Sequence, residues 1–121
     1  MKLEKLPWLL TVCKVPSVGD IDLNAGFYFI GRTDEEISLV CETGAVPASA
    51  TERADGWRAF RVQGTLDFSL IGILSALTGV LAAQKIGVFA VSTYNTDYIL
   101  VRDADFGRAA LALEEAGYTV S

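Results

Sequence analysis

Residues 88–101 read VFAVSTYNTDYILV, two apolar runs separated by polar residues. Val88–Val91 has the composition of a buried strand, and Tyr98–Val101 that of the strand that returns beside it. Asn95-Thr96-Asp97 is typical of a turn, because Asn and Asp side chains hydrogen-bond their own backbone there. The stretch therefore predicts a β-hairpin.

On the N-terminal side of this hairpin the sequence predicts a strand and a helix. Trp57–Val62 alternates between two sets of side chains and predicts a strand that ends at Gly64. From Ile71 to Lys85 the apolar residues recur at steps of three and four, which predicts a helix packed on a sheet. Gly87 is placed to end this helix.

On the C-terminal side the sequence predicts a second helix and a last strand. Asp103 is expected to cap the helix, and Asp105 to favour its first turn through the helix dipole. Gly117 is expected just past the helix end, before a strand over 118–120. Residues 57–120 thus follow the order β-α-β-β-α-β. This order predicts an α+β, ferredoxin-like fold, with an antiparallel sheet and helices on one face.

The first 56 residues predict a separate, β-rich subdomain. Trp8–Val15, Phe27–Ile30 and Ile37–Cys41 predict three strands, the last two joined by a hairpin connection. Residues 43–55 are small and polar, and two interpretations are open for them: a loop, or one short helix entered after Pro47. The strand over 57–62 is compatible with the first subdomain, with the second, or with both.

The composition excludes several classes of function. The 121 residues include no histidine, which removes the usual base of Ser-His-Asp hydrolysis and the commonest ligand of catalytic zinc. With 15 acidic residues against 10 basic ones and no Lys/Arg run, nucleic-acid binding is disfavoured. The sequence has neither a dinucleotide-binding nor a P-loop glycine motif. We expect no metal and no cofactor.

Two further features bear on the location of the protein. Cys13 and Cys41 lie far apart in apolar runs and match no CxxC spacing, so we expect buried, reduced thiols. The N-terminus lacks the apolar segment of a signal peptide, and the longest apolar stretch, Leu70–Ala83, is shorter than the ~20 residues that span a membrane. We therefore expect a cytoplasmic protein without membrane contact.

The first candidate site is the polar segment of the hairpin, residues 92–97. A two-stranded hairpin needs only two turn residues, and here Thr93, Tyr94, Asn95 and Asp97 concentrate donors and acceptors at one strand end. A ligand-binding loop is one interpretation. The other is that these side chains only make local turn hydrogen bonds.

The second candidate site is the segment Asp67–Gly72, before the predicted helix. Free N–H groups at a helix N-terminus bind carboxylates and phosphates, and Gly72 permits close approach of a ligand. Alternatively, Asp67 or Ser69 caps the helix and Gly72 relieves packing against the sheet. The two candidate loops need not be adjacent within one subunit, so a shared pocket would require a pseudo-repeat or a second chain.

Three stretches, WRAFRVQG (57–64), LDFSLIGIL (66–74) and VFAVSTYNTDYILV (88–101), resemble small bacterial ACT-domain proteins. They are also similar to the cytosolic arginine sensors of the CASTOR kind and, more remotely, to the regulatory domains of aspartate kinases. The resemblance implies two tandem ACT-like subdomains, residues 1–56 and 57–121. It also implies a regulatory or sensor protein that binds a small molecule, typically an amino acid, and catalyses no reaction.

The resemblance implies a ligand site between ACT modules. The strand-end motif of the sensors is matched by Thr93, Tyr94 and Asp97, and their glycine loop at a helix start by Gly72. Backbone N–H groups from Ser69 to Gly72 would bind an α-carboxylate, and Asp97 would accept from an α-ammonium or a basic side chain. This chain has two such units where the arginine sensors have four, so a site between units implies a homodimer.

Two other functions are open. A protein-interaction or oligomerisation module would assemble through its sheets and would use the polar loops only structurally. An enzyme on a ferredoxin-like scaffold would fit acylphosphatase-type chemistry, which uses Arg and Asn rather than His. No loop places an Arg in a phosphate-cradling turn, and a fold alone does not establish a reaction. We therefore expect a ligand-binding protein and no enzyme.

Overall fold

The computed structural model describes residues 1–64 and 72–121. These form two compact units, each described below by itself. The split unit combines Met1–Pro7 with Arg58–Ser121, and the inserted unit is Trp8–Trp57. The strand β5 (Glu52–Val62) contributes its first residues to the inserted unit and its last residues to the split unit.

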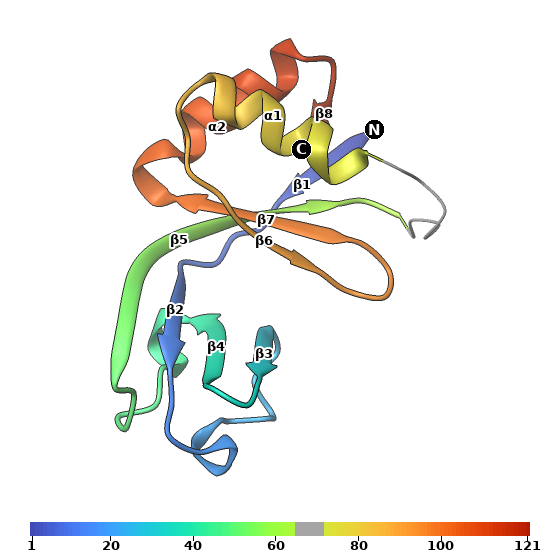
Figure 1. Ribbon diagram of the computed structural model, residues 1–121. Coiled ribbons are helices and arrows are strands. Elements are labelled where there is room, and N and C mark those ends of the chain that lie inside the picture. Colours follow the sequence, from blue (N-terminus) through green and yellow to red (C-terminus); the bar gives the residue numbers. More distant parts are fainter. Residues whose placement is uncertain (65–71) are drawn as a thin grey trace. The chain divides into compact units, whose positions relative to one another are not determined.

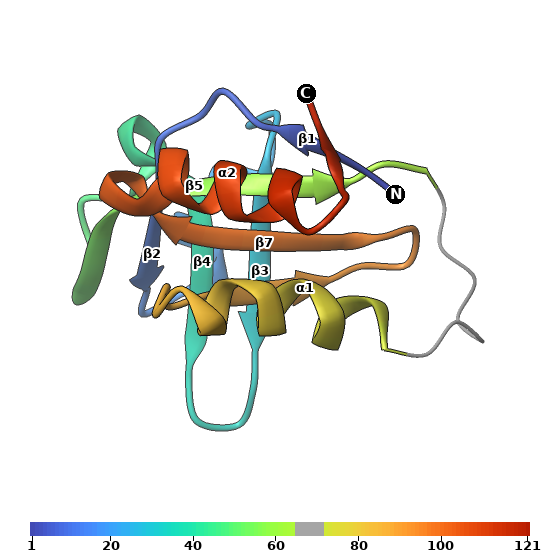
Figure 2. The ribbon, with the colours of Figure 1, turned by 90° about the horizontal axis from the view of Figure 1, so that it is seen from above.

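The split unit contains a sheet with strand order β6-β7-β5-β1-β8 (Figures 1 and 2). Besides β5, its strands are β1 (Lys2–Lys5), β6 (Phe89–Ser92), β7 (Asp97–Arg102) and β8 (Thr119–Val120). The hairpin predicted from residues 88–101 is confirmed as β6 and β7, in which Val91 lies opposite Tyr98.

The strand β1 was not predicted, and it lies between β5 and β8. Leu3 pairs with Val62 on the antiparallel side and with Val120 on the parallel side. In this four-residue strand Leu3 alone is buried, so the segment contains too little alternation to be recognised from its sequence. The ferredoxin-like sheet of residues 58–120 is thus completed by the first residues of the chain.

Two helices, α1 (Ile73–Ala83) and α2 (Phe106–Glu115), cover one face of this sheet (Figure 1). Together with the strands they enclose a core that includes Leu3, Phe60, Leu77, Ile99 and Leu113. The α+β, ferredoxin-like prediction is confirmed. The physical cause is the one predicted, because the apolar positions of α1 at steps of three and four pack against the sheet.

The prediction that Gly87 ends α1 was wrong. Lys85 has a left-handed φ of 58°, and its N–H donates to the Ala82 carbonyl at 2.9 Å. The next N–H, of Ile86, donates to the Leu81 carbonyl at 3.0 Å. This pair of bonds is the Schellman helix ending, in which an apolar contact between Ile86 and Leu81 is expected, and both lie in the core.

The cap predicted for α2 was also wrong, whereas its predicted end is confirmed. Asp103 and Asp105 lie in a 3-10 turn (Asp103–Asp105) ahead of the helix, and no side-chain cap forms. Their carboxylates instead pair with guanidinium groups, Asp103 with Arg58 and Asp105 with Arg108. Gly117, with φ 102°, follows the helix as predicted.

The inserted unit is a sheet with strand order β3-β4-β2-β5. Its other strands are β2 (Leu10–Lys14), β3 (Tyr28–Arg32) and β4 (Ile37–Glu42). The hairpin between β3 and β4 is confirmed, and the Thr33 N–H donates to the Glu36 carbonyl at 2.9 Å. Short 3-10 turns occupy Val18–Asp20 and Thr43–Ala45.

The interpretation of residues 43–55 as a helix entered after Pro47 was wrong. The 3-10 turn of this stretch lies before the proline, and residues from Glu52 onward already belong to β5. The β5 strand pairs with β2, where Lys14 lies opposite Glu52 and Val12 opposite Ala54. Pairing with a distant strand therefore decided the conformation of a segment whose local sequence was ambiguous.

Both cysteines are buried free thiols on one face of the inserted sheet, as predicted. Burial raises the pKa of the Cys13 thiol, and burial together with the neighbouring Cys13 raises the pKa of Cys41 to about 11. A thiol with a raised pKa and little exposure reacts slowly, because the thiolate is the reactive form.

We predict that a thiol reagent modifies Cys13 and Cys41 only when the protein unfolds. The measurement is the rate of modification at neutral pH with and without denaturant, followed by mass spectrometry. Rapid modification of the native protein would contradict the burial of the two side chains.

The Lys85→Gly variant is expected to raise the free energy of unfolding by about 0.5–1 kcal/mol. A left-handed conformation raises the free energy of a lysine residue but not that of a glycine residue, so the substitution removes strain from the folded state. Glycine also has the greater conformational entropy in the unfolded chain, which offsets part of this stabilisation. Denaturant titration measures the change. Gly87→Ala is the control, because Gly87 has no positive φ and a Cβ there would meet no described atom within 4 Å. A destabilised Lys85→Gly protein would contradict this account of the helix end.

Candidate functional site

The C-terminal end of β5 is fixed from both sides. On one side the Gln63 N–H donates to the Lys2 carbonyl of β1 at 2.9 Å. On the other side the Thr96 hydroxyl donates to the Val62 carbonyl at 2.7 Å, and both groups are buried. The turn between β6 and β7 is thereby attached to the strand end that precedes Gly64.

The turn itself is closed by two threonines. The backbone N–H and the hydroxyl of Thr93 both donate to the Thr96 carbonyl, at 2.9 and 3.0 Å. The Thr96 N–H donates to the Thr93 hydroxyl oxygen at 3.4 Å. Thr93 is therefore occupied in shaping the turn, which is the local role that the sequence analysis gave as one interpretation.

The other polar residues of the turn differ in exposure. Tyr94 is 80% exposed, and Asn95 is exposed beside it. Asp97 is half-buried at the start of β7, opposite Ser92. Tyr94 and Asn95 thus lie at the surface, while Asp97 is placed by the sheet.

Gly72 occupies the N-cap position of α1 with a φ of 83°, and its carbonyl accepts the first helical bond from Ala76 at 2.8 Å. The left-handed φ, rather than packing against the sheet, accounts for this glycine, because a Cβ there would meet no described atom within 4 Å. The first N–H groups of an α-helix have no carbonyl acceptor within the helix. Asp67 and Ser69 lie outside the described residues.

Two of the segments singled out in the sequence lie at the same end of the split unit. The turn between β6 and β7 and the start of α1 both lie at the end of the sheet at which β5 ends, in each of the two ribbon views (Figures 1 and 2). One chain therefore brings the hairpin turn and Gly72 to one end of its sheet. The sequence alone did not require this arrangement.

Thr96 is the residue of this region that sequence reasoning missed. It is 6% exposed, and its bonding partner Val62 lies far away in the sequence. No local signal marks it, because a threonine inside a polar turn resembles its exposed neighbours. Its role depends on the pairing of β7 with β5.

The described part of the chain lacks a metal site and a membrane-spanning helix. No group of three His, Cys, Asp or Glu side chains is placed to hold a metal ion there. Within the same residues, no helix has the length and apolar character that crossing a membrane demands.

We predict that Thr96→Val destabilises the protein by about 1–3 kcal/mol, because the buried Val62 carbonyl loses its hydroxyl donor. Denaturant titration measures the change. Thr119→Val is the control, since Thr119 is exposed on β8. Equal stability of the two variants would contradict a structural role for the Thr96 hydroxyl.

Comparison with solved structures places the fold among known proteins. A crystallised protein from Agobacterium tumefaciens is 32% identical, with a TM-score of 0.86 over 99% of this chain and 91% of that one. A Vibrio cholerae protein, described as of unknown function and a possible transport protein, is 21% identical, with a TM-score of 0.76 over 93% of this chain and 86% of that one.

The fold also occurs within a larger enzyme. Clostridium acetobutylicum aspartate kinase, described as allosteric, is 14% identical, with a TM-score of 0.66 over 94% of this chain and 33% of that one. No curated protein matches the chain. A family model described as ACT domain matches residues 52–115, which span β5, the hairpin and both helices. The chain belongs to the ACT-domain family.

Proposed function

We propose that this protein is a cytoplasmic, non-enzymatic regulator that binds an amino acid at the end of the split unit. The proposed site combines the turn over 93–97 with the start of α1 at Gly72, and includes Asp67 and Ser69. Membership of the ACT-domain family supports a regulatory role in small-molecule binding. The observation that carries the proposal is the bond from Thr96 to Val62, which fixes the turn beside the strand end that leads toward α1.

The chemistry of the two segments is complementary to a zwitterion. The first N–H groups of α1 carry the positive end of the helix dipole and suit an α-carboxylate. Asp97 is half-buried at the end of β7 and suits an α-ammonium group. Each charge-assisted hydrogen bond of this kind contributes about 1.5–3 kcal/mol.

Tyr94 and Asn95 suggest that a second copy of the chain completes the site. Both side chains are exposed at the tip of the turn. We therefore propose a homodimer with the ligand at an interface between ACT modules. No cofactor enters this proposal.

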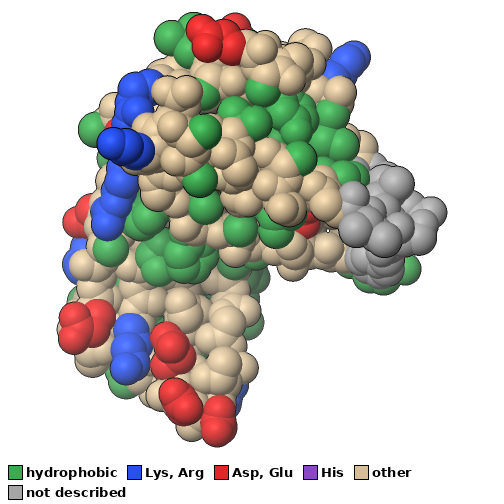
Figure 3. All heavy atoms as spheres, turned by 45° about the horizontal axis from the view of Figure 1, so that its top comes forward, with side chains coloured by type: hydrophobic (Ala, Val, Ile, Leu, Met, Phe, Trp, Pro, Cys, Tyr) green, Lys and Arg blue, Asp and Glu red, His purple; other side chains and the backbone are tan. Residues whose placement is uncertain are grey.

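A second candidate is a protein-interaction module, which the surface of α1 favours. The helix ILSALTGVLAA contains no charged residue, and Ile73, Leu74 and Val80 are only partly buried. Figure 3 shows hydrophobic side chains at the surface of the helical face. A partner protein that covers α1 would remove this apolar surface from water.

Thermal unfolding with each common amino acid tests the proposed function. A ligand at ~100 times its dissociation constant adds about 2.7 kcal/mol to the free energy of unfolding. We expect a selective rise in Tm that Asp97→Ala abolishes, and that the control Asp34→Ala retains, because Asp34 is exposed in the hairpin of the inserted unit.

The same experiment separates the two candidates. If Asp97→Ala leaves every selective shift unchanged, the assignment of the site is contradicted. If no amino acid shifts Tm, the interaction module becomes the better account.

A further inference from the structure

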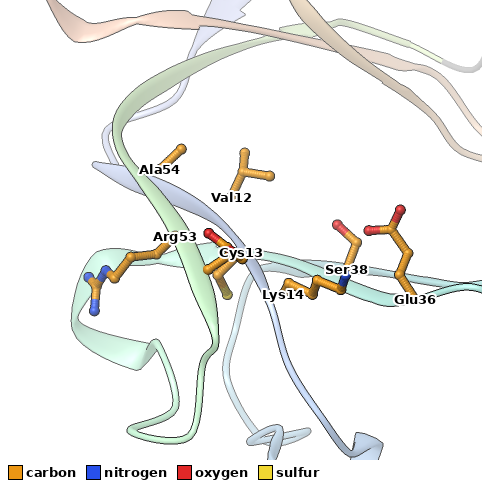
Figure 4. Close-up of a pocket in the computed structure, with 8 residues that line it drawn as sticks. Val12, Cys13, Lys14, Glu36, Ser38, Arg53 and Ala54 are labelled. Carbon is orange, nitrogen blue, oxygen red and sulfur yellow. The ribbon is translucent and has the colours of Figure 1, made fainter.

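The inserted unit contains a pocket of about 320 Å³ on its sheet, beside the C-terminal end of β2 (Figure 4). It is formed by residues of β2, β4 and β5 and by Glu36 of the hairpin connection. The lining residues are Val12, Cys13, Lys14, Glu36, Ser38, Glu52, Arg53 and Ala54. Its volume lies at the lower end of the range for small-molecule pockets, which favours a small ligand.

The apolar part of the pocket is made by two small side chains. Val12 lies opposite Ala54 in the pairing of β2 with β5, so both project from the same face of the sheet. Figure 4 shows both side chains on that face, and both are partly exposed. Cys13, by the alternation of the strand, belongs to the core on the opposite face.

Charges of both signs follow directly along the same face. Lys14 of β2 lies between two partners, opposite Ser38 of β4 and opposite Glu52 of β5. Glu36 adds a second carboxylate at the rim. An ammonium group, a hydroxyl and two carboxylates therefore line the same pocket as the apolar pair Val12 and Ala54.

In the described residues, Lys14, Glu36 and Glu52 form no ion pair with one another. The ion pairs found within residues 1–64 and 72–121 involve neither Lys14 nor Glu36 nor Glu52. Arg53 differs, because its guanidinium pairs with Asp55 at 2.9 Å. Lys14 and Glu52 are therefore available to a ligand without the loss of an internal ion pair.

We infer that this pocket binds a free α-amino acid with a small aliphatic side chain. The α-carboxylate accepts from the Lys14 ammonium and the Ser38 hydroxyl, and the α-ammonium donates to Glu52. The aliphatic side chain lies on Val12 and Ala54.

The arrangement of charges selects a zwitterion over singly charged ligands. A carboxylic acid without an amine would pair with Lys14 and would be repelled by Glu36 and Glu52. An amine without a carboxylate would leave Lys14 close to its own positive charge. Only a ligand with both groups pairs with the Lys14 ammonium and with a carboxylate of the pocket.

This pocket is distinct from the site of the proposed function. All its lining residues lie in the inserted unit, whereas the 93–97 turn and Gly72 lie in the split unit. The inference therefore does not rest on the proposed function, and each site is tested independently by its own variants.

An NMR titration of the full chain with L-valine tests the inference. We expect amide shifts to change first at residues 12–14, 36–38 and 52–54. L-valinamide, which lacks the carboxylate, and 3-methyl-2-oxobutanoate, which lacks the amine, should each bind about tenfold more weakly or worse. Shifts confined to residues 93–97, or no shifts up to millimolar L-valine, would overturn the inference.

Two variants assign the charges. Lys14→Met and Glu52→Gln should each weaken L-valine binding about tenfold or more, because each removes one charge-assisted contact. Lys2→Met and Glu115→Gln are the matched controls, since both residues are exposed in the split unit, and Asp97→Ala should also leave this binding unchanged. Unchanged affinity in Lys14→Met and Glu52→Gln, with native amide spectra, would overturn the inference.

Discussion

The split unit depends on the backbone hydrogen bonds that its first residues make with its last residues. In the described sheet β8 pairs with β1, and β1 pairs with β5. The Lys5 N–H donates to the Ser121 carbonyl at 2.8 Å, and the Ser121 N–H to the Leu3 carbonyl at 2.9 Å. Without β1, the strand β8 would lose its partner and one edge of β5 would be unpaired. The backbone N–H and C=O groups of these strands would then lack hydrogen-bond partners, and each such group that stays buried destabilises the fold.

This constraint also determines where the candidate binding elements lie. Because β1 holds one edge of β5, the other edge is left for β7, and the turn before β7 reaches Val62 through Thr96. In the sequence, residues 8–57 are an insertion between β1 and the last residues of β5, which pair with each other. The inserted unit has its own core, which includes Cys13, Leu39 and Cys41, and its own charged pocket.

The elements with strong local signals were predicted from the sequence. The hairpin over 88–101, the helix α1 and the glycine after α2 each depend on patterns within a few neighbouring residues. The elements that were missed depend on distant partners or on single backbone angles. β1 shows one buried side chain, Lys85 takes a conformation that is common for glycine, and Thr96 bonds to a carbonyl of another strand. The turn that contains the candidate residues was predicted, but the bond from Thr96 to Val62 that positions this turn was not.

Native-state hydrogen exchange of the Lys5 and Thr119 amides tests the central role of β1 most directly. These amides donate to the carbonyls of Ser121 and Met1, at the two ends of the chain. If β1 is part of the cooperative sheet, they exchange with a free energy close to that of the Ile86 amide, which is bonded in the core of the same unit. Exchange at the rate of frayed termini, with Ile86 still protected, would contradict the account.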